Sequence, residues 1–457
     1  MGLKLLSICG FIRTWGFRLL VLVTPLIMTT STREIFEFPK MLFVYLLTLI
    51  IVSVRAVELT ITGRVYRKIN YFTWPAAIFL AGYFLSTLFS LDYYTSLTGY
   101  YTRFNGGLIS VLCFFLLFLI LSSTATARES KNLLRLVLIS ALPVSLYAVA
   151  QHFGADRSFW VQDSQARAFS TFGQPNWLAA YLVLVWPLSL ALLARGGKEK
   201  KALLDLGQGP AHPGVLFLLP LLIFLALWFT YSLSGLLGFA TAVSVFLFLA
   251  GRDFFRANRR FFLMLSAGMF LVAATQPGIF RSRWESLWRQ VDRVVPKATA
   301  LEIAPAPAGY EGDTADIRLI VWRGALKLFI SDPKITLLGT GPETFAYAFL
   351  PFRPTGMNKT SEWDFLYNKA HNDYIETLVT RGLFGLLSLL LMVVSYSHWT
   401  KKTLAKLSAG SFRLVLVALF AGWAGLLVTN IFGWPVVMTS LLFWFYPALA
   451  FTLVKEK

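Results

Sequence analysis

Long apolar runs recur along the whole chain and restrict it to one structural class. A helix needs about twenty apolar residues to cross a hydrocarbon core of roughly 30 Å, and about twelve segments here have that length. The composition agrees, since 56% of the residues are hydrophobic and 14% are charged. We therefore predict an all-α polytopic membrane protein. The expected spans are residues 17–31, 39–58, 72–91, 106–124, 132–152, 176–195, 213–231, 232–250, 260–276, 373–396, 412–430 and 434–453.

The net charge of +19 is divided between the two sides of the membrane. Alternate connections hold about twenty-two Lys and Arg residues, whereas the short connections on the opposite side hold about four. Basic residues collect on the cytoplasmic side of such proteins, so we expect both termini in the cytoplasm. The basic loops are then expected to contact membrane lipids, and no nucleic-acid partner is indicated.

This topology divides the chain into three regions. Residues 1–276 hold the first nine expected helices, 277–372 form one large outer loop with short amphipathic helices, and 373–457 hold the last three helices. Cys9 and Cys113 are far apart in the sequence and indicate neither a disulfide framework nor a metal site.

A histidine precedes the tenth expected helix, in the stretch YNKAHNDYIETLVTRGLFG (residues 367–385). Asp373 and Glu376 have the spacing of a capping box, which predicts a helix start at Asp373 or Tyr374. His371 would then lie near the positive end of the helix dipole, which favours the neutral ring that can accept a proton. The alternative is an interfacial histidine that bonds only to a loop carbonyl.

The outer loop contains a predicted helix over residues 316–332. Arg323 lies on its polar face and Trp322 on its apolar face, and Arg318 also falls on the apolar face. Such an arginine can extend its head into water, pair with a carboxylate, or bind an anion, because a guanidinium matches phosphate oxygens. The following Gly-rich stretch GTGPETF, 339–345, lacks the Lys-Ser/Thr of a P-loop and is predicted to be a tight turn.

Four segments together resemble the bacterial O-antigen ligase and O-antigen polymerase superfamily. They resemble the family's T-F-G-N-P-N, S-R-S-G, Arg-x-x-x-Trp and histidine motifs in the family order. The segments are RAFSTFGQPNWLAAYL (167–182, with Gln174 replacing an Asn), TYSLSGLLGF (230–239), DIRLIVWRGALKLFISDPKITLLGTGPETF (316–345) and AHNDYIETLVTRGLFG (370–385).

The resemblance implies a GT-C-like glycosyltransferase with its active site at the periplasmic face of the bacterial inner membrane. It would move a glycan from undecaprenyl pyrophosphate to an acceptor sugar hydroxyl such as that of lipid A–core, with no cofactor and no essential metal. His371 would be the general base, and Arg318 would bind the pyrophosphate. The family often has an arginine at the position of Leu233, so that charge is expected from elsewhere. Candidate substrate-binding residues are Arg167, Arg281, Arg283, Arg323, Trp322 and Tyr374.

Two relatives of this reaction and one different class of function remain as alternatives. A polymerase would use another lipid-linked repeat unit as the acceptor, and a protein O-oligosaccharyltransferase would use a protein. A single large outer loop favours the ligase. A transporter of the major-facilitator type would have its longest connection in the cytoplasm after the sixth helix, but the connection here, 196–212, is short.

Overall fold

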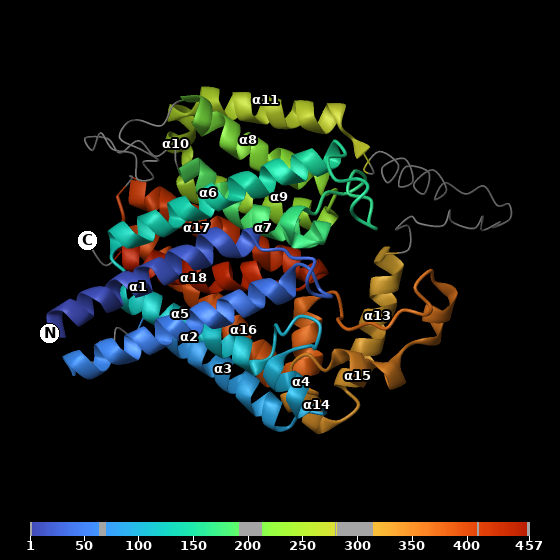
Figure 1. Cartoon of the computed structure of the whole chain (residues 1–457). Helices are drawn as coiled ribbons and strands as arrows, with labels where there is room; N and C mark the ends of the chain where they lie inside the picture. Colours follow the sequence, from blue (N-terminus) through green and yellow to red (C-terminus); the bar gives the residue numbers. More distant parts are fainter. Residues whose placement is uncertain are drawn as a thin grey trace.

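The computed structural model describes residues 2–63, 70–191, 213–278, 280, 314–408 and 411–454. Long helices run side by side as a bundle, and both termini lie at the same end of it (Figure 1). The long helices are α1 (Gly2–Val23), α2 (Glu37–Thr62), α3 (Thr73–Leu88), α5 (Leu108–Thr124), α6 (Ala127–His152), α7 (Pro175–Leu190), α8 (Pro213–Phe229), α9 (Leu233–Ala250), α11 (Arg259–Thr275), α16 (Asp373–Lys406), α17 (Ser411–Thr429) and α18 (Val437–Val454).

The described helices are consistent with the predicted polytopic membrane protein. Seven of them are long and apolar enough to cross a membrane, and four further apolar helices are shorter. Each predicted span overlaps one of the long helices, although twelve crossings stay a prediction.

The predicted bounds of the first span are wrong, because α1 extends back to Gly2 and ends at Val23. Its end is set by Pro25, which lies in a 3₁₀ turn and cannot continue an α-helix. The part of α1 that precedes the predicted span contains basic residues. One of them, Arg13, forms an ion pair with Glu58 of α2. This pairing compensates a charge that the sequence pattern placed outside the span.

The turn between α8 and α9 is very short. Tyr231 adopts a left-handed backbone conformation, with φ of +45°. Ser232 caps α9, since its side chain accepts a hydrogen bond from the Gly235 N–H at 3.1 Å. Three residues therefore suffice to reverse the chain.

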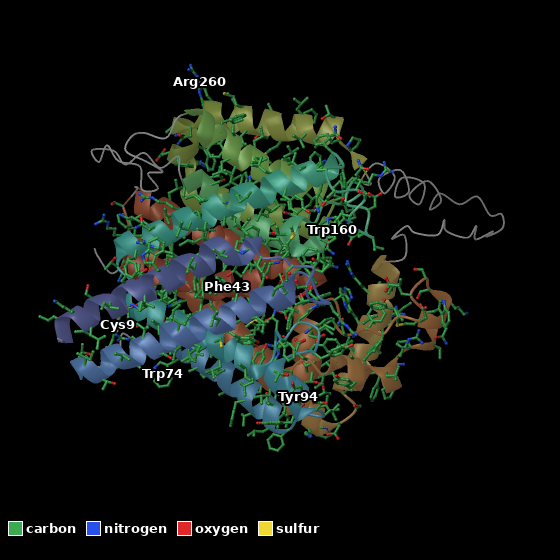
Figure 2. All side chains as sticks on the ribbon, viewed as in Figure 1. Cys9, Phe43, Trp74, Tyr94, Trp160 and Arg260 are labelled. Carbon is green, nitrogen blue, oxygen red and sulfur yellow. The ribbon has the colours of Figure 1, made fainter. Side chains whose placement is uncertain are left out.

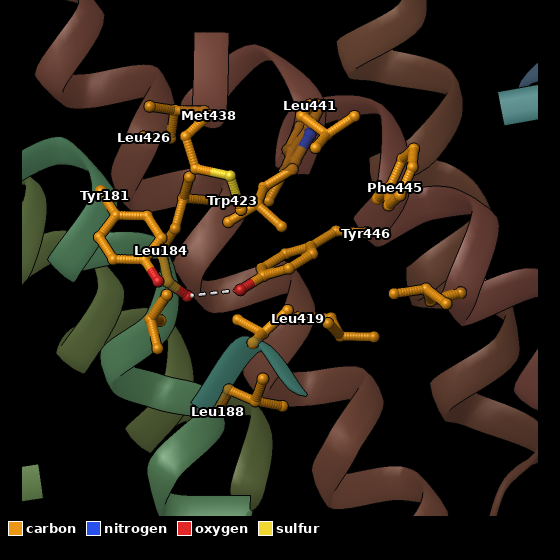
Figure 3. Packing of buried hydrophobic residues seen from close by; sticks show 14 of the residues in the cluster. Tyr181, Leu184, Leu188, Leu419, Trp423, Leu426, Met438, Leu441, Phe445 and Tyr446 are labelled. Carbon is orange, nitrogen blue, oxygen red and sulfur yellow. Dashed lines mark hydrogen bonds between the residues drawn. The ribbon is translucent and has the colours of Figure 1, made fainter. Parts of the chain in front are cut away.

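The centre of the bundle is built on α17, which packs against α7, α9 and α18. A Cβ at Gly422 would lie 2.3 Å from the Leu184 carbonyl oxygen, so only glycine allows this close approach of α17 to α7. The Tyr446 hydroxyl donates to the same Leu184 carbonyl at 3.1 Å, among buried side chains that include Trp423 and Met438 (Figure 3). The interior of the bundle is thus densely packed around α17.

A small unit with its own core lies at the end of the bundle opposite to the termini (Figure 1). Figure 2 locates the two ends by Cys9 on α1 and Trp160 in the loop after α6. The unit includes α13 (Thr314–Phe329), which confirms the predicted amphipathic helix. Its other helices are α14 (Pro333–Leu338) and α15 (Phe345–Phe349).

Helix α16 is not continuous, although its sequence predicts one unbroken helix. Gly382 has φ of +66° and ψ of −170°, which interrupts the helical hydrogen bonding. The predicted tight turn is present after α14 and fills the break: the N–H groups of Thr340 and Gly341 donate to the carbonyls of Val379 (3.0 Å) and Thr380 (2.9 Å). The turn therefore joins the small unit to the bundle through backbone hydrogen bonds.

Candidate active site

His371 lies directly before the first turn of α16. The helix begins at Asp373, as predicted, but the predicted capping box is wrong. The cap is Asn372, whose Oδ1 accepts hydrogen bonds from the N–H groups of Tyr374 and Ile375, both at 3.0 Å. An amide side chain binds these two free N–H groups without adding a charge, and it fixes the backbone beside His371.

The backbone of His371 has a left-handed conformation, with φ of +55°. This conformation costs a non-glycine residue about 1–2 kcal/mol, and the contacts of the preceding residue hold it in place. The Ala370 N–H donates to the Glu376 carboxylate at 2.7 Å, and Trp322 Nε1 donates to the Ala370 carbonyl at 2.9 Å. Glu376 therefore binds the backbone of Ala370 and does not act in the predicted capping box. These two hydrogen bonds fix the backbone that precedes His371.

The His371 ring is half-buried between aromatic side chains. Its centroid lies 4.9 Å from that of Trp434 and 5.8 Å from that of Tyr367, both edge to face. Burial, together with the positive charges of Arg318 and Arg103, lowers the pKa of His371 to about 4. The ring is consequently neutral at pH 7 and has a nitrogen able to accept a proton.

A small cavity beside His371 is the place where the family-like segments meet. Its volume of about 10 Å³ corresponds to room for about one water molecule. Three of the four segments contribute to its wall, and the turn after α17 completes it. The lining residues are Gln174, Asn176, Trp177, Ala180, Ser234, His371, Thr429, Asn430, Phe432, Gly433 and Trp434.

Arg167 joins two of these segments but lines neither this cavity nor the larger one described below. Its Nε donates to the Thr230 carbonyl at 3.0 Å, and one terminal nitrogen donates to Asn176 Oδ1 at 3.2 Å. Ser232 donates to the same Asn176 oxygen at 2.7 Å. Leu233, where the family often has an arginine, is 53% exposed. Arg167 thus holds Asn176, which lines the small cavity, through a hydrogen bond.

Arg318 and Trp322 lie one helical turn apart on α13. The Trp322 N–H binds the Ala370 carbonyl, and the Arg318 charge reaches both the His371 and Tyr367 rings. Arg323 is exposed on another face of α13 and lines neither cavity. The structure therefore brings Arg318 and Trp322, but not Arg323, to the surroundings of His371.

The remaining predicted residues have different positions. The Tyr374 hydroxyl donates to the Leu427 carbonyl at 2.8 Å and so ties α16 to α17, while its ring lines the larger cavity. Arg281 and Arg283 lie outside the described residues.

The larger cavity has a volume of about 110 Å³ and shares Asn430 and Trp434 with the smaller one. One part of its wall is polar and charged, and another part is apolar and lies between helices of the bundle. The polar residues include Arg103, Asn105, Glu343, Lys369, Asp373, Glu376 and Arg381, and the apolar residues include Phe79, Phe114, Leu389, Leu426, Phe443 and Trp444.

Lys369 in this wall is compensated by carboxylates. It forms ion pairs with Glu343 and with Glu376, the latter at 3.6 Å. Burial alone would lower the pKa of Lys369, but these two carboxylates outweigh it and raise the pKa above its usual value. Lys369 therefore keeps its positive charge, and the two carboxylates balance that charge in the cavity wall.

Arg381 likewise faces protein. It donates to the Tyr83 hydroxyl at 2.6 Å and lies 3.9 Å from an Asp373 carboxylate oxygen. Its charge is thereby accommodated inside the bundle.

The sequence analysis missed Arg103, which precedes α5 and lies over the rings of Trp177 and Trp434. Its guanidinium carbon is 4.9 Å and 5.6 Å from the two ring centroids. A signal was present, because Arg103 is one of the few basic residues in the short connections that are expected on the outer side.

Comparison with known proteins agrees with three of the four segments, because the matched range begins after the segment 167–182. Residues 218–390 match the O-antigen ligase family, a range that includes Arg318, Trp322 and His371. No curated protein matches the chain. The match over residues 218–390 therefore supports a relation to the superfamily of O-antigen ligases and O-antigen polymerases.

Proposed function

We propose that this protein transfers a glycan from undecaprenyl pyrophosphate to an acceptor sugar hydroxyl, in the manner of an O-antigen ligase acting on lipid A–core. The reaction would take place at the periplasmic face of the inner membrane, with both termini in the cytoplasm. The observation that carries this proposal is the neutral His371 beside a cavity at which the family segments meet, with two arginine charges acting on its ring. The match of residues 218–390 to the O-antigen ligase family supports a glycan transferase of the ligase or polymerase type.

In the proposed reaction the acceptor hydroxyl occupies the cavity beside His371. The imidazole accepts the hydroxyl proton while the hydroxyl oxygen bonds to the anomeric carbon of the donor glycan. The bond between that carbon and the pyrophosphate oxygen breaks, and its electron pair stays on the pyrophosphate. The leaving group gains one negative charge, which Arg318 stabilises as it develops.

The low pKa of His371 has a consequence for this mechanism. An imidazole with a pKa of about 4 is neutral but a weak base in the free protein. An anionic pyrophosphate near Arg318 offsets the positive charge that acts on the ring, so donor binding raises the pKa of His371. His371 is then a better base when the donor is present.

The test is a lipopolysaccharide gel from cells that lack this protein and carry either the wild type or His371→Ala. Under the ligase proposal, the deletion leaves bare core while polymer accumulates on the lipid carrier, and His371→Ala does not restore the ladder. His398→Ala is the matched control, because His398 is exposed near the far end of α16, and it restores the ladder fully.

Other outcomes would change the proposal in distinct ways. Core that bears a single repeat unit identifies a polymerase, the second candidate within the superfamily. An unchanged ladder in the deletion strain rules out both, and acceptance of the glycan by a protein identifies an O-oligosaccharyltransferase. Full rescue by His371→Ala removes the histidine mechanism.

A further inference from the structure

Arg103 lies at the boundary between the two cavities. It belongs to the connection between α4 (Tyr93–Thr98) and α5 and lines the larger cavity. Its guanidinium lies over the rings of Trp177 and Trp434, both of which line the smaller cavity with His371. The two indoles therefore hold a cation in the wall that separates the base from the larger cavity.

Arg103 differs from the other cations of this wall in having no carboxylate at ion-pair distance among the described residues, and Glu34 acts on it only at longer range. Its Nε atom is buried without a hydrogen-bond partner. No ion pair found within the described ranges involves it, whereas Lys369 is paired with Glu343 and Arg381 lies near Asp373. A buried N–H group without an acceptor is costly unless a ligand completes the site.

The shape of the larger cavity indicates what kind of anion fits. Next to Arg103 the wall is polar, while Phe79, Phe114, Leu389 and Phe443 form an apolar wall between the helices. A ligand with an anionic head and a hydrocarbon chain matches both parts, and a free sugar matches only the first. A prenyl pyrophosphate is such a ligand.

We propose that Arg103 binds the pyrophosphate of the prenyl-linked donor and supplies the positive charge that is absent at Leu233. This inference rests on the proposed function and adds to it a residue and the larger cavity as the donor site. When the bond to the anomeric carbon breaks, its electron pair goes to the pyrophosphate oxygen, and Arg103 binds the additional negative charge. Arg103 and Arg318 approach the reaction from separate elements, the α4–α5 connection and α13.

The experiment uses the full-length protein in phosphatidylcholine nanodiscs, with farnesyl pyrophosphate as the probe and calorimetry as the readout. Arg103→Gln is expected to weaken binding about 10- to 100-fold, the usual effect of losing a hydrogen bond to a charged group. Arg103→Lys is expected to lose less, because it keeps the charge but not the planar fork of donors. The matched control is Arg157→Gln, an exposed arginine of the next outer loop, which binds as the wild type does.

A purely structural role for Arg103 gives a different result. In a transfer assay, Arg103→Gln should raise KM for the donor and leave KM for the acceptor unchanged. Equal loss for both substrates, with a lower melting temperature, would overturn the inference. If Arg103→Gln does not fold, the same comparison is made with Arg103→Lys, which keeps the cation over both indoles.

The remaining outcomes separate this inference from the proposed function. Unchanged affinity of Arg103→Gln for farnesyl pyrophosphate overturns the assignment of Arg103 and leaves the glycan transferase intact. Failure of the wild type to bind any prenyl pyrophosphate overturns both. Nanodiscs containing phosphatidylglycerol, and inorganic pyrophosphate as a second probe, test the other sources of phosphate. Competition by either at the concentration at which farnesyl pyrophosphate binds would overturn the prenyl assignment.

Discussion

Asn372 closes the first turn of α16, and its replacement by alanine is expected to release the segment that carries His371. The Asn372 side chain is buried, with 6% of its surface exposed, and accepts hydrogen bonds from two backbone N–H groups. Loss of an asparagine cap costs about 0.5–2 kcal/mol. Because two buried donors lose their acceptor here, we expect a cost of about 1–2 kcal/mol. This equals the cost of about 1–2 kcal/mol of the left-handed backbone at His371, so the backbone can relax.

Hydrogen exchange measured by mass spectrometry on the full-length protein in detergent tests this expectation. A local loss of 1–2 kcal/mol raises the exchange rate in residues 367–378 by about 5- to 30-fold, and glycan transfer decreases with it. Asn372→Ser keeps an oxygen acceptor at the cap and should exchange nearly as the wild type does.

Asp332→Ala is the matched control for a lost cap at another helix. The Asp332 side chain accepts from the Lys334 N–H at 2.7 Å at the start of α14, so exchange should rise there and not around His371. Wild-type exchange rates around residue 371 in Asn372→Ala would refute the view that this cap holds the His371 backbone.

Three further predictions concern the same region. Gly382→Ala should lower the melting temperature, because φ is +66° and a Cβ would meet backbone atoms of α14 at 2.3 Å, whereas Gly10→Ala, with open space in α1, should not. Trp322→Phe leaves the Ala370 carbonyl without its donor and should cost about 1–3 kcal/mol; a transfer rate and melting curve like those of the wild type would contradict this. In carbon-13 NMR of labelled histidines, His371 should titrate with a pKa of about 4 in the free protein and higher with farnesyl pyrophosphate, since an anion favours imidazolium. A value near the ordinary 6.5 without ligand would contradict the effects of burial and of the nearby arginines.

The spans were predictable because each depends on a local property, a run of apolar residues long enough for a membrane. The predicted helices differ from the observed ones where a residue from a distant segment contacts the helix. Arg13 belongs to α1 because Glu58 of another helix compensates its charge, and α16 breaks at Gly382 because the turn after α14 supplies N–H groups to its free carbonyls. Neither partner is visible in the sequence of the helix itself.

The candidate site was predictable in part for the same reason. His371 and Arg318 were found because each breaks a local pattern, a rare histidine at a helix start and a charge on an apolar face. The spacing of Asp373 and Glu376 misled, because it is compatible with a capping box whether or not Asn372 takes the cap. Asn372 does so here, and Glu376 instead binds the Ala370 N–H.

The sequence by itself determined the class of the protein, the positions of most helices and the family resemblance, since these depend on composition, periodicity and short motifs. Only the tertiary structure decided which residues surround His371. Trp177 and Trp434 lie more than 250 residues apart in the chain, and packing of α7 against α17 brings them together around Arg103. The charge that acts on the base and the shape of the cavity beside it arise from contacts between distant segments, and no local pattern encodes such contacts.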